Sequence, residues 1–177
     1  MKILLVGLLA VSGLAVAADL KPGDPAPSFT LQGSDGKTHD LAQLKGHTVV
    51  LAWFPKVFSG GCTAECRSFR ESGESLRKYD VNYFAISTFD LRSNTNFAES
   101  LSCDYPILAD PERKVAEAYG VLRPDGAHAN RWTYYIGPDG KILEIDKEVR
   151  VQTAGPDVAA KLDALHVPKR GGTPAKN

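Results

Sequence analysis

The chain has 177 residues, of which 43% are hydrophobic and 24% charged, and its 21 basic and 21 acidic residues cancel to a net charge of +0. This balance gives no reason to expect nucleic acid or an anionic membrane surface as a partner. Three cysteines are too few for a dense disulfide framework and cannot all pair within one chain. Their number therefore favours thiol chemistry over structural cross-linking.

The N-terminus has the pattern of a secretory signal peptide. A single early charge, Lys2, precedes an apolar run from Ile3 to Val16, which closes on the small-x-small pattern Ala15-Val16-Ala17. The run is short for a membrane span, and no charged stop-transfer flank follows it. We therefore expect cleavage after Ala17, an exported or periplasmic protein, and no membrane attachment once the signal is removed. The alternative is an uncleaved N-terminal anchor.

Strands and helices alternate along the rest of the chain. Alternating or continuous apolar patterns predict strands at residues 28–31, 37–41, 48–54, 81–87, 105–109, 132–136 and 141–147. Helical spacing and capping residues predict helices at residues 62–79, 94–101, 111–120 and 157–165. Early strand–helix units demand a parallel sheet core, to which hairpins add antiparallel strands. The expected fold class is α/β: a thioredoxin-like sandwich with a central mixed sheet flanked by helices, an N-terminal hairpin and a strand–helix insertion.

The chain is long enough for one domain with its own core. We expect this domain at residues 18–167, after the signal peptide at residues 1–17. The last stretch, residues 168–177 (PKRGGTPAKN), has no apolar content to bury. It is predicted to be a disordered tail.

The most informative stretch is FPKVFSGGCTAECRSFR, from Phe54 to Arg70. Cys62 lies where a predicted strand gives way to a helix. The unpaired N–H groups and the positive end of the helix dipole favour a thiolate there, and the thiolate is the nucleophilic form. Gly60 and Gly61 let the backbone approach a small ligand closely. In the alternative interpretation, Cys62 is only a small buried hydrophobic residue.

These residues resemble the active-site signature of the peroxiredoxins, Pro-x-x-x-Thr/Ser-x-x-Cys, with Pro55, Ser59 and Cys62 in the matching places. Glu65 falls where that family places a supporting glutamate. The later stretch RWTYYIGPDGKI resembles the family's Arg-x-Thr-Phe-x-Ile-Asp, which implies that Arg131 is the catalytic arginine. The resemblance covers most of the chain after the signal. It is greatest to the bacterioferritin-comigratory (Q-type) subgroup of this alkyl hydroperoxide reductase and thiol-specific antioxidant family.

The resemblance implies an enzyme: a thiol-dependent peroxidase, without a cofactor or metal, that reduces hydrogen peroxide or organic hydroperoxides. Attack by Cys62 on the peroxide would give a sulfenic acid, which a second thiol condenses into a disulfide. Arg131 would stabilise the thiolate and the charge on the departing oxygen, and Ser59 can both donate to and accept from the peroxide. We expect a thioredoxin-like protein or a small thiol as the reductant, and a monomer or weak homodimer.

The sequence leaves the identity of the second thiol open. In the Q-type subgroup the resolving cysteine commonly lies five positions after the first, whereas Cys66 lies four after Cys62. On an intact helix, Cβ atoms at this spacing are about 5–6 Å apart, which is too far for a disulfide. A Cys62–Cys66 bridge therefore requires the first helical turn to unwind. Cys66 is the favoured resolving residue; the alternatives are Cys103, an external thiol, or Cys66 as an ordinary core residue.

Two other functions fit parts of the pattern. An exported copper chaperone of the cytochrome-oxidase assembly type would bind Cu(I) through Cys62, Cys66 and a distant histidine, for which His128 is the candidate. A copper site, however, has no need of Arg131. A thiol–disulfide oxidoreductase would need Cys-x-x-Cys and a proline just before the strand that begins at Trp132, and the chain has neither. The peroxidase is therefore favoured.

Overall fold

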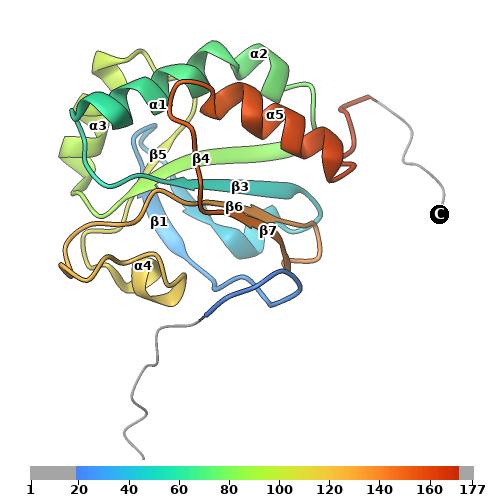
Figure 1. The fold of residues 1–177 in the computed structure, drawn as a ribbon, viewed down its shortest axis with the longest axis horizontal. Helices are drawn as coiled ribbons and strands as arrows, with labels where there is room; N and C mark the ends of the chain where they lie inside the picture. The colour runs from blue at the N-terminus through green and yellow to red at the C-terminus, as the bar shows by residue number, and fades with distance from the viewer. Residues whose placement is uncertain (1–18, 172–177) are drawn as a thin grey trace, which may run out of the picture.

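The computed structural model describes residues 19–171, which form a single sheet with helices on both faces (Figure 1). The signal peptide expected at residues 1–17 lies outside the described residues, as do residues 172–177 of the expected tail. Among the helices in the described part of the chain, none has the length and apolar character needed to cross a membrane.

Seven strands form one mixed sheet in the order β2-β1-β5-β4-β3-β6-β7. The strands are β1 Thr30–Gly33, β2 Thr38–Asp40, β3 Thr48–Trp53, β4 Val81–Ser87, β5 Ile107–Ala109, β6 Thr133–Ile136 and β7 Ile142–Asp146. The central strands β3, β4 and β5 are parallel to one another. The hairpins β1–β2 and β6–β7 join them as antiparallel strands. The predicted thioredoxin-like α/β fold is confirmed.

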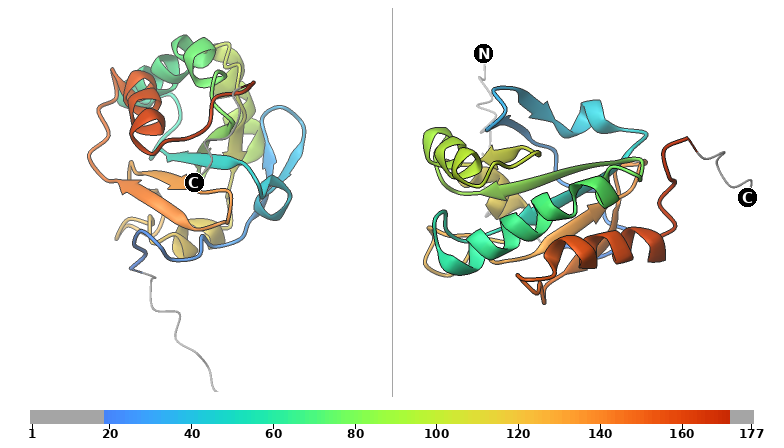
Figure 2. Two further views of the ribbon diagram at one scale, coloured as in Figure 1. Left: turned by 90° about the vertical axis from the view of Figure 1, so that its right-hand side faces the viewer. Right: turned by 90° about the horizontal axis from the view of Figure 1, so that it is seen from above.

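The helices are distributed unequally over the two faces of the sheet. They are α1 Gly60–Glu71, α2 Gly73–Leu76, α3 Leu91–Ser100, α4 Lys114–Ala118, α5 Ala154–Ala164 and the short 3₁₀ helix η1 Leu41–Leu44. In Figure 1, α1, α2, α3 and α5 cover the upper face, while α4 lies below the sheet. From above, α1 and α5 run side by side across the strands (Figure 2).

Strand β3 shows why the central strands have continuously apolar sequences. All six of its residues are buried. Val50 and Ala52 belong to the core beneath α1, α3 and α5, whereas Val49, Leu51 and Trp53 belong to the core on the α4 side. Successive side chains of a strand point to opposite faces, so a strand covered on both faces must be apolar at every position.

The helix expected at residues 62–79 is divided in two. It ends as α1 at Glu71 and resumes as α2 after Ser72. The N-terminus of α5 packs against α1 just before this break. There the N–H of Gly155 donates to the hydroxyl of Ser68 at 3.0 Å. A Cβ at Gly155 would lie 2.3 Å from the carbonyl oxygen of Ser68, so only glycine permits this approach.

The helix expected at residues 111–120 is shorter than predicted. Arg113 adopts a left-handed conformation with φ of 62°, so the helix begins only at Lys114. The carboxylate of Asp110 does not cap a helix that starts at Pro111; it accepts a hydrogen bond from the N–H of Ala116 at 2.7 Å. The intervening residues are therefore a turn. The other elements lie within a few residues of their predicted bounds.

The folded chain also extends beyond the expected boundary at Val167. The carbonyl of Pro168 accepts a hydrogen bond from the N–H of Asp80 at 2.7 Å. The guanidinium of Arg170 donates to the carbonyl oxygens of Tyr79 and Val81 at 2.9 and 3.1 Å. The start of the tail was misplaced because these contacts are polar, whereas the prediction considered only apolar burial.

Candidate active site

Cys62 is held at the start of α1, directly after the loop that leaves β3. This loop contains Pro55, which is half-buried, and ends at Ser59, the residue that precedes the helix in an extended conformation. The hydroxyl of Ser59 donates to the carbonyl of Lys56 at 3.0 Å. Cys62 is the third residue of α1 and is fully buried. Its predicted place in the first turn of a helix is confirmed.

The sheet brings Arg131 to Cys62 from 69 residues away. Strands β3 and β6 are antiparallel neighbours, and the N–H of Trp53 donates to the carbonyl of Trp132 at 2.9 Å. Arg131 therefore lies at the end of β3 where α1 begins. Its Nη2 donates to the Sγ of Cys62 at 3.3 Å. A Cβ at Gly61 would lie 3.4 Å from that nitrogen, in ordinary van der Waals contact, so the guanidinium lies directly against the first turn of α1.

A buried carboxyl group fixes the other side of the guanidinium. Glu65 lies one helical turn after Cys62, its side chain is 2% exposed, and its Oε2 accepts a hydrogen bond from Nη1 of Arg131. Burial raises the pKa of Glu65 to about 7, although the charge of Arg131 lowers it in part. Its Oε1 is buried without a hydrogen-bond partner among the described residues. Glu65 therefore orients Arg131 and does not reach the sulfur itself.

The second cysteine of α1 faces the core. Cys66 is 1% exposed, and burial, together with the charge of Glu65, raises the pKa of its thiol well above the ordinary value. Its carbonyl oxygen accepts a hydrogen bond from the hydroxyl of Tyr105 at 2.9 Å. Cys103 is half-buried, and burial raises its pKa as well. All three cysteines are free thiols, and α1 is intact across Cys62 and Cys66.

Sequence reasoning missed one residue of the loop before α1. Phe58 has a left-handed backbone with φ of 57° and is 58% exposed. Its ring lies edge-on against that of Phe97, with 5.1 Å between centroids. A left-handed conformation is uncommon for a residue with a large side chain, and no local sequence signal announces it at this position.

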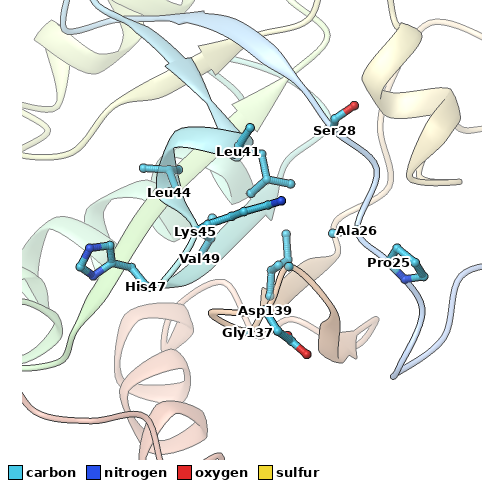
Figure 3. Close-up of a pocket in the computed structure, with 13 residues that line it drawn as sticks. Pro25, Ala26, Ser28, Leu41, Leu44, Lys45, His47, Val49, Gly137 and Asp139 are labelled. Atoms are coloured by element: carbon cyan, nitrogen blue, oxygen red, sulfur yellow. The ribbon is translucent and has the colours of Figure 1, made fainter.

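A separate pocket of about 270 Å³ lies far from this site (Figure 3). Its apolar lining includes Leu41, Val49 and Ile136, and the side chain of Lys45 extends across it. Val49 is near the beginning of β3, whereas Cys62 follows the end of that strand. Neither Cys62 nor Arg131 lines this pocket. It is therefore not the place where a ligand would meet the reactive thiol.

The copper-binding alternative finds no support in the geometry. Within residues 19–171, there is no group of three or more histidine, cysteine, aspartate or glutamate side chains that could hold a metal ion. The candidate third ligand, His128, contacts the carboxylate of Asp125 at 3.1 Å and lies beside the ring of Phe89.

Comparison with known proteins shows the family. Residues 22–145 match the AhpC/TSA family. The chain is 33% identical over 134 residues to peroxiredoxin Bcp of Escherichia coli (strain K12), covering 71% of this chain and 85% of that protein. It is 33% identical over 129 residues to peroxiredoxin Bcp of Bacillus subtilis (strain 168), covering 73% and 80% respectively.

Solved structures agree with the sequence matches. The crystal structure of peroxidoxin BcpB from Mycobacterium tuberculosis has a TM-score of 0.74 and 31% identity, covering 82% of this chain and 97% of that one. Peroxiredoxin Q of Xanthomonas campestris, at 24% identity and a TM-score of 0.74, supports the fold. The comparisons give the copper-chaperone alternative no support. This chain belongs to the AhpC/TSA family and is a peroxiredoxin, a thiol-dependent peroxidase similar to the Bcp and Q-type proteins.

Proposed function

We propose that Cys62 is the residue that attacks the peroxide and that Arg131 activates it. The hydrogen bond from Nη2 of Arg131 to the Sγ of Cys62, at 3.3 Å, is the observation that supports this assignment. A guanidinium in this position can hold the peroxide against the sulfur and stabilise the negative charge of the reaction. Because Glu65 fixes the opposite nitrogen of the guanidinium, this contact is organised before the substrate arrives.

The reaction is a displacement at oxygen. The Cys62 thiolate attacks one peroxide oxygen, the O–O bond breaks, and the other oxygen leaves as hydroxide or alkoxide and takes up a proton. Arg131 stabilises the charge on the departing oxygen. The hydroxyl proton of Ser59 is engaged by Lys56, so its oxygen is free to accept a hydrogen bond from the peroxide. Pro55 restricts the loop that presents these groups.

Access to the sulfur requires movement. Cys62 is fully buried, so a peroxide reaches its Sγ only when the preceding loop or the first turn of α1 opens. The same opening would serve the next step, in which Cys66 condenses with the sulfenic acid of Cys62 and releases water. On the intact helix the two sulfurs are too far apart for a bond. Cys66 is therefore the proposed resolving residue, with local unwinding of α1 as its condition.

The proposal includes the setting in which the enzyme works. The signal-peptide pattern that ends at Ala17 favours an exported, periplasmic protein of residues 18–177, active as a monomer or weak homodimer. A thioredoxin-like protein or a small thiol would reduce the disulfide. N-terminal sequencing of the protein from a periplasmic fraction should give a chain beginning at Ala18. Recovery of the uncleaved chain from the cytoplasm would contradict this part of the proposal.

Stopped-flow reaction with hydrogen peroxide tests the assignment of Cys62. The reduced wild-type protein should consume peroxide, and Cys62→Ser should consume none, because Cys62 is the cysteine whose sulfur accepts a hydrogen bond from the Arg131 guanidinium. Burial raises the pKa of Cys66 and of Cys103, which disfavours direct attack by either thiol on the peroxide. Cys103→Ser serves as the matched control and should still react with one equivalent. A Cys62→Ser protein that reduces peroxide would show that the nucleophile has been misassigned.

A further inference from the structure

Cys103 has no part in the mechanism above, yet it lies close to it. It belongs to the turn between α3 and β5, just after Ser102, whose φ of 50° is left-handed. Cys103 is half-buried and lines a surface hollow of about 260 Å³ together with Ala98 and Tyr105. Of the three thiols, it is the one with access to solvent, because Cys62 and Cys66 are 0% and 1% exposed.

Two contacts fasten the turn that carries Cys103 to α1. The hydroxyl of Tyr105 donates to the carbonyl of Cys66 at 2.9 Å, and Nη1 of Arg70 donates to the carbonyl of Leu101 at 2.9 Å. Cys103 itself packs against the core cluster that contains Cys66 and Tyr105. The turn therefore holds Cys103 next to the helical turn that contains Cys66.

Cys66 lies in the buried core cluster that also contains Cys62, and the half-buried Cys103 packs against that cluster. Cys62 precedes it by four residues on α1, while Cys103 approaches from the turn after α3. An exchange of disulfide partners at Cys66 would therefore join two segments that are already packed against each other.

The proposed resolving step creates a difficulty that Cys103 would remove. A Cys62–Cys66 bridge holds the start of α1 unwound, so the site around Cys62 cannot re-form while that bridge lasts. Thiol–disulfide exchange requires the attacking sulfur to reach a sulfur of the bridge. A reductant would meet a disulfide at Cys103 more readily, because that residue lies at the surface hollow.

We propose that Cys103 is a third redox cysteine, which takes over the disulfide from Cys62 and presents it at the surface. This inference rests on the proposed function of Cys62 and Cys66. The Cys103 thiol loses its proton to solvent, and its sulfur attacks the Sγ of Cys66 in the Cys62–Cys66 bridge. The Cys62–Cys66 bond breaks, Cys62 leaves as a thiolate, and a Cys66–Cys103 bond forms. The exchange is redox-neutral, because the chain carries one disulfide before and after it; an external dithiol then reduces the Cys66–Cys103 bridge to two thiols and is itself oxidised to a disulfide.

The direction of this exchange follows from the surroundings of Cys62. A thiol leaves a disulfide more readily when its thiolate is stabilised. Arg131 is placed to stabilise Cys62 in that form, with its Nη2 3.3 Å from the sulfur. Release of Cys62 also lets the first turn of α1 re-form, so that the enzyme regains its peroxide-reactive thiolate before the reductant acts.

Mapping of the disulfides over time tests the exchange. The reduced wild-type protein would receive one equivalent of hydrogen peroxide, and samples would be acid-quenched, alkylated and digested at intervals. We expect a Cys62–Cys66 bridge first, replaced by a Cys66–Cys103 bridge with Cys62 alkylated. A lasting Cys62–Cys66 bridge with Cys103 alkylated throughout would overturn the proposal. So would a Cys62–Cys103 bridge, because it would mean that Cys103 resolves the sulfenic acid directly.

The rate of reduction tests the benefit of the exchange. Oxidised Cys103→Ser should contain only the Cys62–Cys66 bridge, and dithiothreitol should reduce it at least tenfold more slowly than the oxidised wild type. Ser100→Ala, an exposed change three residues earlier that leaves every thiol in place, should be reduced at the wild-type rate. Equal rates for Cys103→Ser and the wild type would overturn the proposal.

The two proposals fail in different ways. If Cys62 is not the nucleophile, Cys62→Ser still consumes peroxide in the stopped-flow experiment, before any disulfide is examined. If only the exchange is wrong, peroxide consumption depends on Cys62 as expected, while the map ends at Cys62–Cys66 or shows Cys62–Cys103.

Discussion

Replacement of Arg131 by alanine or lysine separates its two contacts. One guanidinium nitrogen contacts the buried carboxylate of Glu65 and the other lies 3.3 Å from the sulfur of Cys62. Alanine removes both contacts. Lysine keeps a positive charge, but its single ammonium nitrogen cannot reproduce the fork that spans the two groups. The two variants should therefore differ in stability and agree in reactivity.

The magnitudes follow from these contacts. A hydrogen bond to a charged group contributes about 1.5–3 kcal/mol, which corresponds to a loss of roughly 10- to 150-fold in the rate of peroxide reduction. Arg131→Ala also leaves Glu65 buried without its partner, which costs about 3–5 kcal/mol of folding free energy when the carboxylate is charged. Arg131→Lys should recover part of that stability and little of the rate.

Two measurements check this reasoning. Stopped-flow reaction with hydrogen peroxide gives the rate, and urea unfolding at pH 8, where the carboxyl group of Glu65 is mostly ionised, gives the stability. Glu65→Gln is the matched control, because it keeps the guanidinium beside Cys62 and removes only the buried charge. A wild-type peroxide rate in Arg131→Ala, or full recovery of the rate in Arg131→Lys, would refute the role assigned to the guanidinium fork.

Three further predictions concern Cys66, Glu65 and the C-terminal contacts. Cys66→Ser should react once with peroxide and then stop at a sulfenic acid that dimedone labels; normal cycling with a dithiol would show that Cys66 does not resolve it. Burial raises the pKa of Glu65 from its ordinary 4.5 to about 7. At a pH between these two values, the folded protein keeps the Glu65 proton that the unfolded chain has lost. The free energy of unfolding of the wild type should therefore fall relative to Glu65→Gln as the pH rises through this window, by on the order of 3 kcal/mol, measured in urea. A difference that does not vary with pH would mean that the pKa of Glu65 is not raised. Arg170→Ala should lower the unfolding free energy by about 1–2 kcal/mol, because it removes the hydrogen bonds to Tyr79 and Val81. An unchanged urea midpoint would show that these bonds add nothing to stability.

Local patterns in the sequence were sufficient for most of the fold. The strand at residues 48–54 was predicted from an unbroken apolar run, and the structure covers β3 on both faces as that run requires. The part of the site around Cys62 is also built from residues that are close together in the sequence. Pro55, Ser59 and Cys62 lie within one loop and the first turn of one helix, so their mutual arrangement follows from their spacing. Their resemblance to a known signature then identified the family, and it is on this resemblance that Arg131 was assigned.

The tertiary structure decided what the distant parts of the chain contribute. Only the pairing of β3 with β6 places Arg131 against Cys62, and only the covering of α1 by the core turns Glu65 from a helix carboxylate into a buried one. The break in the long helix lies where α5 approaches it at Gly155. The neighbourhood of Cys66 and Cys103 depends in the same way on a contact between α1 and Tyr105. Each is an interaction between residues far apart in the chain, which helical and strand periodicity do not encode, because periodicity records which face of an element is buried and not what buries it.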